Sequence, residues 1–261
     1  MSDSPLVRAE VRDRVATLTI DHPPANTLSL ATLDALHEAL ETALADTAVK
    51  AIVLTGAGKL FAAGADINEL NALDRREDGE AFSRKGQALC RLIEDAPKPV
   101  IAALNGRYAV GGGAEVAMAC HLRLAEQSTQ IGSPEVHLGL MVGWGASQRL
   151  PRLVGVGRAI EMLLTGQPMA ATEAKRIGLI NRVVPDGEVV SEAQSLARQL
   201  TALSGPVLAA TLEAVRVGVR EGFEAGSARE RALFGALCEN ADWHEGTQAF
   251  LDKRPPQFQD R

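Results

Sequence analysis

The chain has 261 residues, which is enough for one large domain with a sizeable core. Its net charge of -6 and aromatic content of 3% exclude a nucleic-acid scaffold, which needs a basic face and stacking side chains. Cys90, Cys120 and Cys238 are widely spaced and form no C-x-x-C pair, which excludes a disulfide framework or a zinc site and indicates a reducing compartment.

Two further features concern the cellular location. Residues 1–10 lack a basic segment followed by an apolar one, and no uninterrupted apolar run is long enough to span a bilayer. We therefore expect a cytoplasmic protein with neither a membrane nor a nucleic acid as partner.

The N-terminal segments alternate between strand and helix patterns. Residues 6–12 and 15–20 alternate apolar and polar side chains around a charged turn, which predicts an antiparallel pair of strands. Ser29 is placed to cap a helix that carries leucines at helical spacing from Leu30 to Leu44. The wholly apolar run 51–55 is typical of a buried strand.

Glycine-rich loops follow two successive buried strands. Loop 56–66 comes after the strand at 51–55, and a helix is predicted over 80–94. A second strand at 99–104 leads into the glycine triplet 111–113 and an apolar stretch that begins a helix. This recurrence indicates an α/β layer in which two loops build one site.

The second half of the chain becomes almost entirely helical. Short strands are expected at 121–125 and 130–135. Helices are expected at 146–153, 158–164, 171–177, 187–203, 206–218, 223–240 and 244–251. The change of pattern near residue 190 suggests an α/β body (1–190) that holds the active site, and a helical C-terminal region (191–261) that packs on it.

Several well-known binding motifs are excluded because each lacks one required residue. Loop 56–60 has Leu60 where a phosphate-binding loop requires Ser or Thr, and the triplet 111–113 lacks the third glycine of a dinucleotide fingerprint. Glu41 stands where a zinc-binding helix needs His. We expect no metal and no redox cofactor.

Two glycine loops and two carboxylates, Glu115 and Glu135, remain. Backbone N–H groups from both loops can converge on one carbonyl oxygen and stabilise it as it becomes an enolate. The carboxylates can then act as general base and acid on the adjacent carbons, provided that burial raises the pKa of one of them.

Four segments in order carry a resemblance: FAAGADI at 61–67, NGRYAVGGGAE at 105–115, IGSPEVHLG at 131–139 and EGTQAFLDKR at 245–254. Over essentially the whole chain, the sequence resembles the enoyl-CoA hydratase/isomerase (crotonase) superfamily. The resemblance implies a spiral of ββα units, a helical C-terminal oligomerisation region in a homotrimer or hexamer, and an acyl-CoA thioester substrate. Coenzyme A is then part of the substrate, and no separate cofactor is implied.

The resemblance also assigns roles to residues of this chain. It implies an oxyanion hole made by the amides of Ala65 and Gly112, and the catalytic pair Glu115 and Glu135. The implied substrate-binding residues are Ala63, Asp66 and Ile67 for the adenine, Gly111, Trp144 close to the acyl side of the site, and Phe250 and Lys253 from a neighbouring subunit.

The presence of both glutamates favours hydration of a 2-enoyl-CoA to a 3-hydroxyacyl-CoA. However, Trp144 stands where the family usually has a small residue, which leaves open double-bond isomerisation, thioester hydrolysis or decarboxylation. A catalytically silent, oligomeric binding protein is the alternative from another class. In that case Glu115 would only complement a helix dipole, and Trp144 would only pack.

Overall fold

The structure is a computed structural model that describes residues 5–261. Residues 1–4, part of the segment inspected for a leader and of the expected unit 1–190, lie outside the described residues. The main sheet has six strands in the order β1-β2-β3-β4-β6-β9. They are β1 (Val7–Arg12), β2 (Val15–Ile20), β3 (Ala51–Gly56), β4 (Val100–Leu104), β6 (Leu122–Glu126) and β9 (Arg182–Val184). The pair β1–β2 is antiparallel as expected, and every other pairing in this sheet is parallel.

A second, smaller sheet joins β5 (Tyr108–Val110), β7 (Gln130–Gly132) and β8 (Met169–Ala170). Strands β4 and β6 of the main sheet are each followed by a strand of the small sheet and then by a helical turn. The expected ββα units and the α/β class are therefore confirmed. The expected strand over 130–135 ends at Gly132, because Pro134 begins a 3₁₀ helix, η1 (Pro134–Leu138).

Helices cover both faces of the parallel strands. Ile52 and Leu54 of β3 belong to the larger apolar cluster, which includes α1 (Leu30–Ala45) and α3 (Arg76–Glu94). Ala51 and Val53 point to the other face, where α8 (Val189–Thr201) packs. Burial on both faces explains why this strand is a continuous apolar run.

Shorter helices complete the body. They are α2 (Ile67–Asn71), α4 (Gly112–Ala119), α5 (Ala146–Val154), α6 (Val156–Thr165) and α7 (Ala171–Arg176). Cys90, Cys120 and Cys238 are free thiols.

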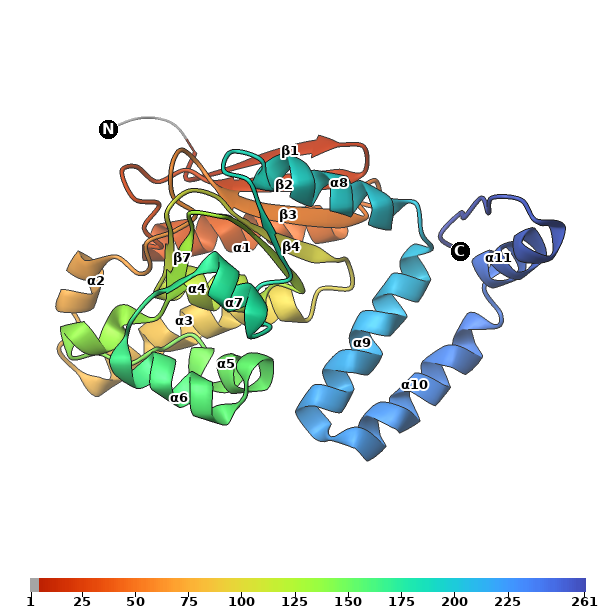
Figure 1. Ribbon diagram of the computed structural model, residues 1–261. Coiled ribbons are helices and arrows are strands. Elements are labelled where there is room, and N and C mark those ends of the chain that lie inside the picture. The colour runs from red at the N-terminus through yellow and green to blue at the C-terminus, as the bar shows by residue number, and fades with distance from the viewer. Residues whose placement is uncertain (1–4) are drawn as a thin grey trace.

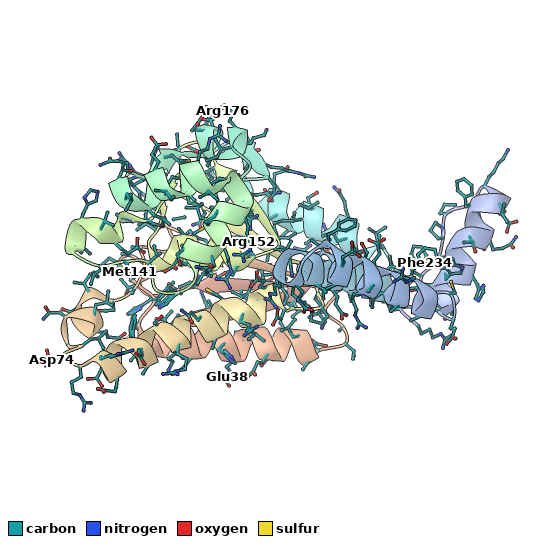
Figure 2. The ribbon with its side chains drawn as sticks, turned by 90° about the horizontal axis from the view of Figure 1, so that it is seen from below. Glu38, Asp74, Met141, Arg152, Arg176 and Phe234 are labelled. Carbon is teal, nitrogen blue, oxygen red and sulfur yellow. The ribbon has the colours of Figure 1, made fainter. Side chains whose placement is uncertain are left out.

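The C-terminal helices extend away from the two sheets (Figure 1). Helices α9 (Gly205–Glu221) and α10 (Phe223–Leu237) form a hairpin, which α11 (Ala241–Asp252) follows. Figure 2 shows Phe234 at the end of the molecule opposite Asp74 and Met141. The tail returns to the body, where Asp260 pairs with Arg14 at 2.9 Å and Lys50 at 2.7 Å. Packing of this region on neighbouring subunits stays a prediction.

Within residues 5–261 no single helix is long and apolar enough to cross a membrane. Helices α8 and α9 satisfy the length and composition criteria only when taken together, and they are bent by 108°.

Two asparagines fix the first glycine loop, residues 56–66. Asn26 Nδ2 donates to the carbonyls of Ala57 at 2.9 Å and Leu60 at 2.7 Å. Asn105 Oδ1 accepts from Gly56 N at 3.0 Å, and its Nδ2 donates to Gly58 O at 3.1 Å. Three loop carbonyls, those of Ala57, Gly58 and Leu60, therefore accept hydrogen bonds from side chains, which helps to hold an irregular segment in one conformation.

Asn26 is 3% exposed and has a positive φ of 51°. We predict that Asn26→Ala lowers the free energy of unfolding by about 2–4 kcal/mol, because buried carbonyls lose their donors. Urea unfolding measures this loss. Asn26→Gly removes the same hydrogen bonds but tolerates positive φ, so its loss should be smaller. An unchanged unfolding midpoint in Asn26→Ala would show that the loop does not depend on this side chain.

Candidate active site

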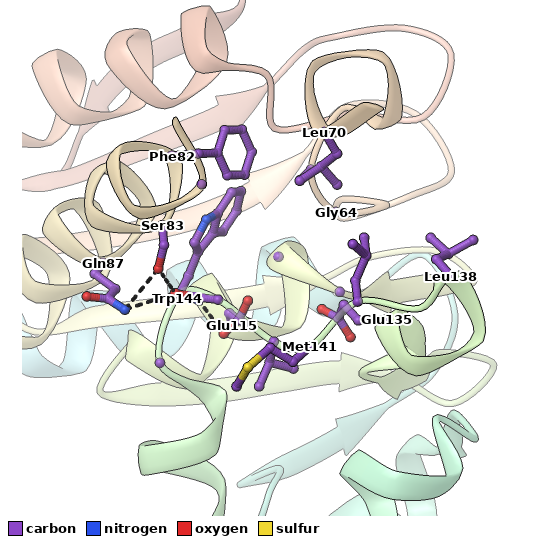
Figure 3. A pocket seen from close by; sticks show the side chains of 18 of the residues that line it. Gly64, Leu70, Phe82, Ser83, Gln87, Glu115, Glu135, Leu138, Met141 and Trp144 are labelled. Carbon is purple, nitrogen blue, oxygen red and sulfur yellow. Dashed lines mark hydrogen bonds between the residues drawn. The ribbon is translucent and has the colours of Figure 1, made fainter. Parts of the chain in front are cut away.

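One cavity of about 790 Å³ lies between the two glycine loops, α3 and the segment after η1. Its lining includes Ala65, Gly112, Glu115, Glu135 and Trp144. Figure 3 shows both glutamate side chains extending into it, with Trp144 and Phe82 on one side. Four residues that the sequence predicts to take part in the reaction therefore line the same cavity as Trp144.

The two glycine loops touch because neither has a side chain at the contact. A Cβ added to Gly64 would lie 3.3 Å from the amide nitrogen of Gly112 and 3.5 Å from Cα of Gly111. Gly64 and Gly111 also have positive φ values of 99° and 57°, which favour glycine. This contact places the peptide after Gly64 beside the start of α4.

Ala65 and Gly112 each present an N–H without a backbone acceptor in the described part of the chain. The carbonyl of Gly64 accepts from Leu28 N at 2.8 Å, so the Ala65 N–H of the same planar peptide points the opposite way. The carbonyl of Gly111 accepts from Glu115 N at 3.0 Å, which leaves the Gly112 N–H free at the helix start. Two N–H groups without a backbone acceptor among the described residues therefore lie where the two glycine loops meet.

Glu115 lies in the first turn of α4 and is only 2% exposed. Its Oε1 accepts two hydrogen bonds of 2.8 Å, from the N–H groups of Trp144 and Ala146. Burial raises the pKa of this carboxyl to about 7, and the two amides oppose that shift while the charge of Glu135 adds to it. A carboxyl with this pKa exchanges protons near neutral pH.

Glu135 follows Pro134 in the first turn of η1. Its Oε1 would lie 3.4 Å from a Cβ added to Gly111, which places it beside the second glycine loop. Its Oε2 is buried and has no hydrogen-bond partner among residues 5–261. Burial raises the pKa of this carboxyl as well.

Trp144 forms part of the cavity wall and is 2% exposed. Its indole lies so close to Gly86 of α3 and Gly112 of α4 that a Cβ at either position would collide with the ring. The ring also packs against Phe82, with centroids 5.8 Å apart. Trp144 therefore has a packing role, while its backbone N–H serves Glu115.

The other predicted substrate-binding residues divide into two groups. Ala63, Ile67 and Gly111 line the cavity. Asp66 does not line it, because its carboxylate caps α2 by accepting from Asn68 N at 2.8 Å. Phe250 is 83% exposed and Lys253 caps the C-terminus of α11, at the other end of the molecule from α2 (Figure 1). Within one chain the structure does not bring these two residues to the cavity.

Sequence reasoning missed the contribution of α3. Ser83 Oγ and Gln87 Nε2 donate to the carbonyl of Gly143 at 2.6 and 2.9 Å, as Figure 3 shows, and Phe82 lines the wall. These residues lie on one face of a helix far from both glycine motifs in the sequence. Only the fold reveals that this face adjoins the site. In the part of the chain that the structure describes, no group of three or more His, Cys, Asp and Glu side chains is arranged to hold a metal.

The raised pKa of Glu115 predicts a pH-dependent difference in stability. Between its ordinary value of 4.5 and its folded-state value of about 7, the folded protein holds this proton more tightly than the unfolded chain. This contribution therefore lowers stability as pH rises through that window. We compare the free energies of unfolding of Glu115→Gln and wild type. We predict that the variant's value minus the wild-type value is about 3 kcal/mol larger at pH 8 than at pH 4. Urea unfolding of both proteins at the two pH values measures it. A constant difference would contradict the shifted pKa.

Comparison with known proteins identifies the family. Residues 10–261 match the family described as enoyl-CoA hydratase/isomerase. A protein of Bacillus subtilis (strain 168) named "Probable enoyl-CoA hydratase" is 42% identical over 94% of this chain and 95% of its own length. The "Short-chain-enoyl-CoA hydratase" of Clostridium acetobutylicum is 38% identical over 94% of each chain. A crystal structure of an enoyl-CoA hydratase from Bacillus anthracis superposes with a TM-score of 0.93 at 33% identity, covering 98% of this chain and 100% of the other. The chain therefore belongs to the enoyl-CoA hydratase/isomerase family.

Proposed function

We propose that the protein hydrates a 2-enoyl-CoA thioester to a 3-hydroxyacyl-CoA. The observation that carries the proposal is the convergence of Glu115, Glu135 and the Ala65 and Gly112 amides on one cavity. The names of the relatives support the same reaction, since those compared above are called enoyl-CoA hydratases.

The two amides form the proposed oxyanion hole. In the reaction, negative charge develops on the thioester oxygen as a nucleophile adds to the β-carbon. Two fixed N–H donors beside that oxygen stabilise the charge without having to reorganise, and each such donor is worth about 3 kcal/mol. The Ala65 and Gly112 N–H groups, which have no backbone acceptor within residues 5–261, fit this role.

Each of the two carboxyls carries out one proton transfer. Because Oε1 of Glu115 is occupied by two amides, Oε2 is left for a water molecule. Ionised Glu115 takes a proton from that water as its oxygen bonds to the β-carbon, and protonated Glu135 gives a proton to the α-carbon. The substrate gains one water, and the proton that Glu115 took returns to Glu135 by exchange with solvent. No separate cofactor is needed.

Coenzyme A would lie along the first glycine loop, where Ala63 and Ile67 line the cavity. Phe250 and Lys253 would reach it only from a neighbouring subunit of a trimer or hexamer. We retain a cytoplasmic location as part of the proposal. The cavity lining within one chain includes Ala65, Gly112, Glu115 and Glu135.

We predict that Glu115→Gln and Glu135→Gln each fold but lose hydration by about 10²–10⁴-fold, because each removes one proton-transfer group. Loss of the conjugated-thioester absorbance with short, medium and branched enoyl-CoA substrates measures it. Glu80→Gln is the matched control, since Glu80 also lines the cavity but pairs with Arg76 at 2.7 Å. Full activity in both glutamine variants would refute the mechanism. Tight binding of enoyl-CoA by wild type without turnover would instead favour the silent binding protein.

A further inference from the structure

The segment after η1 holds Glu115 through its backbone. The N–H groups of Trp144 and Ala146 both donate to Oε1 of this carboxyl. Their direction determines where the carboxyl points and how well its charged form is stabilised. Any contact that fixes residues 144–146 therefore also affects the orientation and the pKa of the Glu115 carboxyl.

Arg149 of α5 holds this segment through a hydrogen bond to the carbonyl of Trp144. Its Nη1 donates to the carbonyl of Trp144 at 3.0 Å, and its Nη2 donates to Oε2 of Glu94 at 3.0 Å. Gly145, with φ of 113°, makes room for the guanidinium, because a Cβ there would collide with Nη1. The side chain of Arg149 is 15% exposed. A planar guanidinium that binds two acceptors at once has little freedom to move.

The same Glu94 carboxylate is also bound from the C-terminal hairpin. Arg220 of α9 donates from Nη2 to Oε2 of Glu94 at 2.8 Å, and its Nη1 lies 2.6 Å from Oδ1 of Asp95. Arg216, one turn earlier, donates to the carbonyl of Asp95 at 3.1 Å. Helix α9 is therefore attached to the end of α3 at the carboxylate that orients Arg149.

We propose that Arg149 is a positioning residue for Glu115, and that Glu94 and Arg220 connect the attachment of α9 to the active site through it. Arg149 holds the Trp144 carbonyl, which keeps the Trp144 and Ala146 N–H groups directed at the carboxyl. Release of α9 frees one side of Glu94, and release of Glu94 frees Arg149. The inference rests on the proposed function for its kinetic consequences but not for its structural ones.

The direction in which the pKa of Glu115 moves follows from the groups around its carboxyl. Glu135 faces it from η1, Cys90 from α3, and Arg149 lies on α5. The Cys90 thiol stays neutral because burial raises its pKa. Loosening the amides withdraws hydrogen-bond donors from the charged form of Glu115, so the pKa of this carboxyl moves further upward.

The test uses the full chain and five substitutions, one of which, Glu115→Gln, serves only to identify the NMR signal of Glu115. Arg149→Gln removes the contact, and Arg149→Lys keeps the charge but cannot bridge both acceptors. Arg220→Gln acts only from α9, and it stays informative if a variant at Arg149 does not fold. Arg229→Gln is the matched control, because it removes an ion pair of 2.6 Å with Glu213 on the same hairpin but outside this network.

The first readout does not depend on activity. Carbon-13 NMR of glutamate-labelled protein follows the Glu115 carboxyl, identified by its absence in Glu115→Gln. We expect its midpoint to rise most in Arg149→Gln, less in Arg149→Lys and Arg220→Gln, and not in Arg229→Gln. The second readout is kinetic: kcat should fall about tenfold in Arg149→Gln with KM nearly constant, and the acidic limb of the pH profile should move to higher pH.

A Glu115 midpoint that stays at its wild-type value in folded Arg149→Gln would overturn the proposal. A shift in Arg149→Gln with none in Arg220→Gln would overturn the connection to α9. Failure of the proposed function has a different signature, since wild type would then not hydrate any enoyl-CoA while the NMR midpoints still shifted as expected.

Discussion

A carboxyl group buried in the first turn of a helix determines much of this structure. Charged Glu115 would be costly there without donors, and the two amides from residues 144 and 146 supply them. Those amides reach the carboxyl because Trp144 fits against Gly86 and Gly112, where no side chain obstructs its ring. The glycine triplet, α3 and the segment before α5 are therefore mutually dependent.

The close approach of two backbones is the second constraint. Gly64 and Gly111–Gly112 come together because they lack side chains, and Asn26 and Asn105 hold the first loop from outside. The N–H groups of Ala65 and Gly112 stay available because the carbonyls of their peptide units are bonded elsewhere. Rigid donors are what a developing oxyanion requires, since they need not move during the reaction.

Much of the body could be predicted from the sequence. The strands β3 and β4 are continuous apolar runs. The glycines of both loops, Glu115 and Glu135 stand in segments that resemble motifs of the family. Other features depend on contacts between distant segments. The strands β5, β8 and β9 have two or three residues each, too short for a periodic signal. The contacts of Ser83 and Gln87 with Gly143 join residues about sixty positions apart, and nothing local marks them. For Asp66 the motif suggests a contact with the adenine, whereas in the structure its side chain caps the short helix α2.

In the proposed reaction, one cavity brings two amides to a thioester oxygen and two carboxyls to the adjacent carbons. A crystal structure with a 3-oxoacyl-CoA, which cannot be hydrated and whose enolate carries charge on that oxygen, tests it most directly. We predict the thioester oxygen at about 2.7–3.1 Å from the nitrogens of both Ala65 and Gly112, with the carboxyls of Glu115 and Glu135 beside the α- and β-carbons. A thioester oxygen bound away from either nitrogen, or an acyl group outside the space between the two carboxyls, would contradict the account.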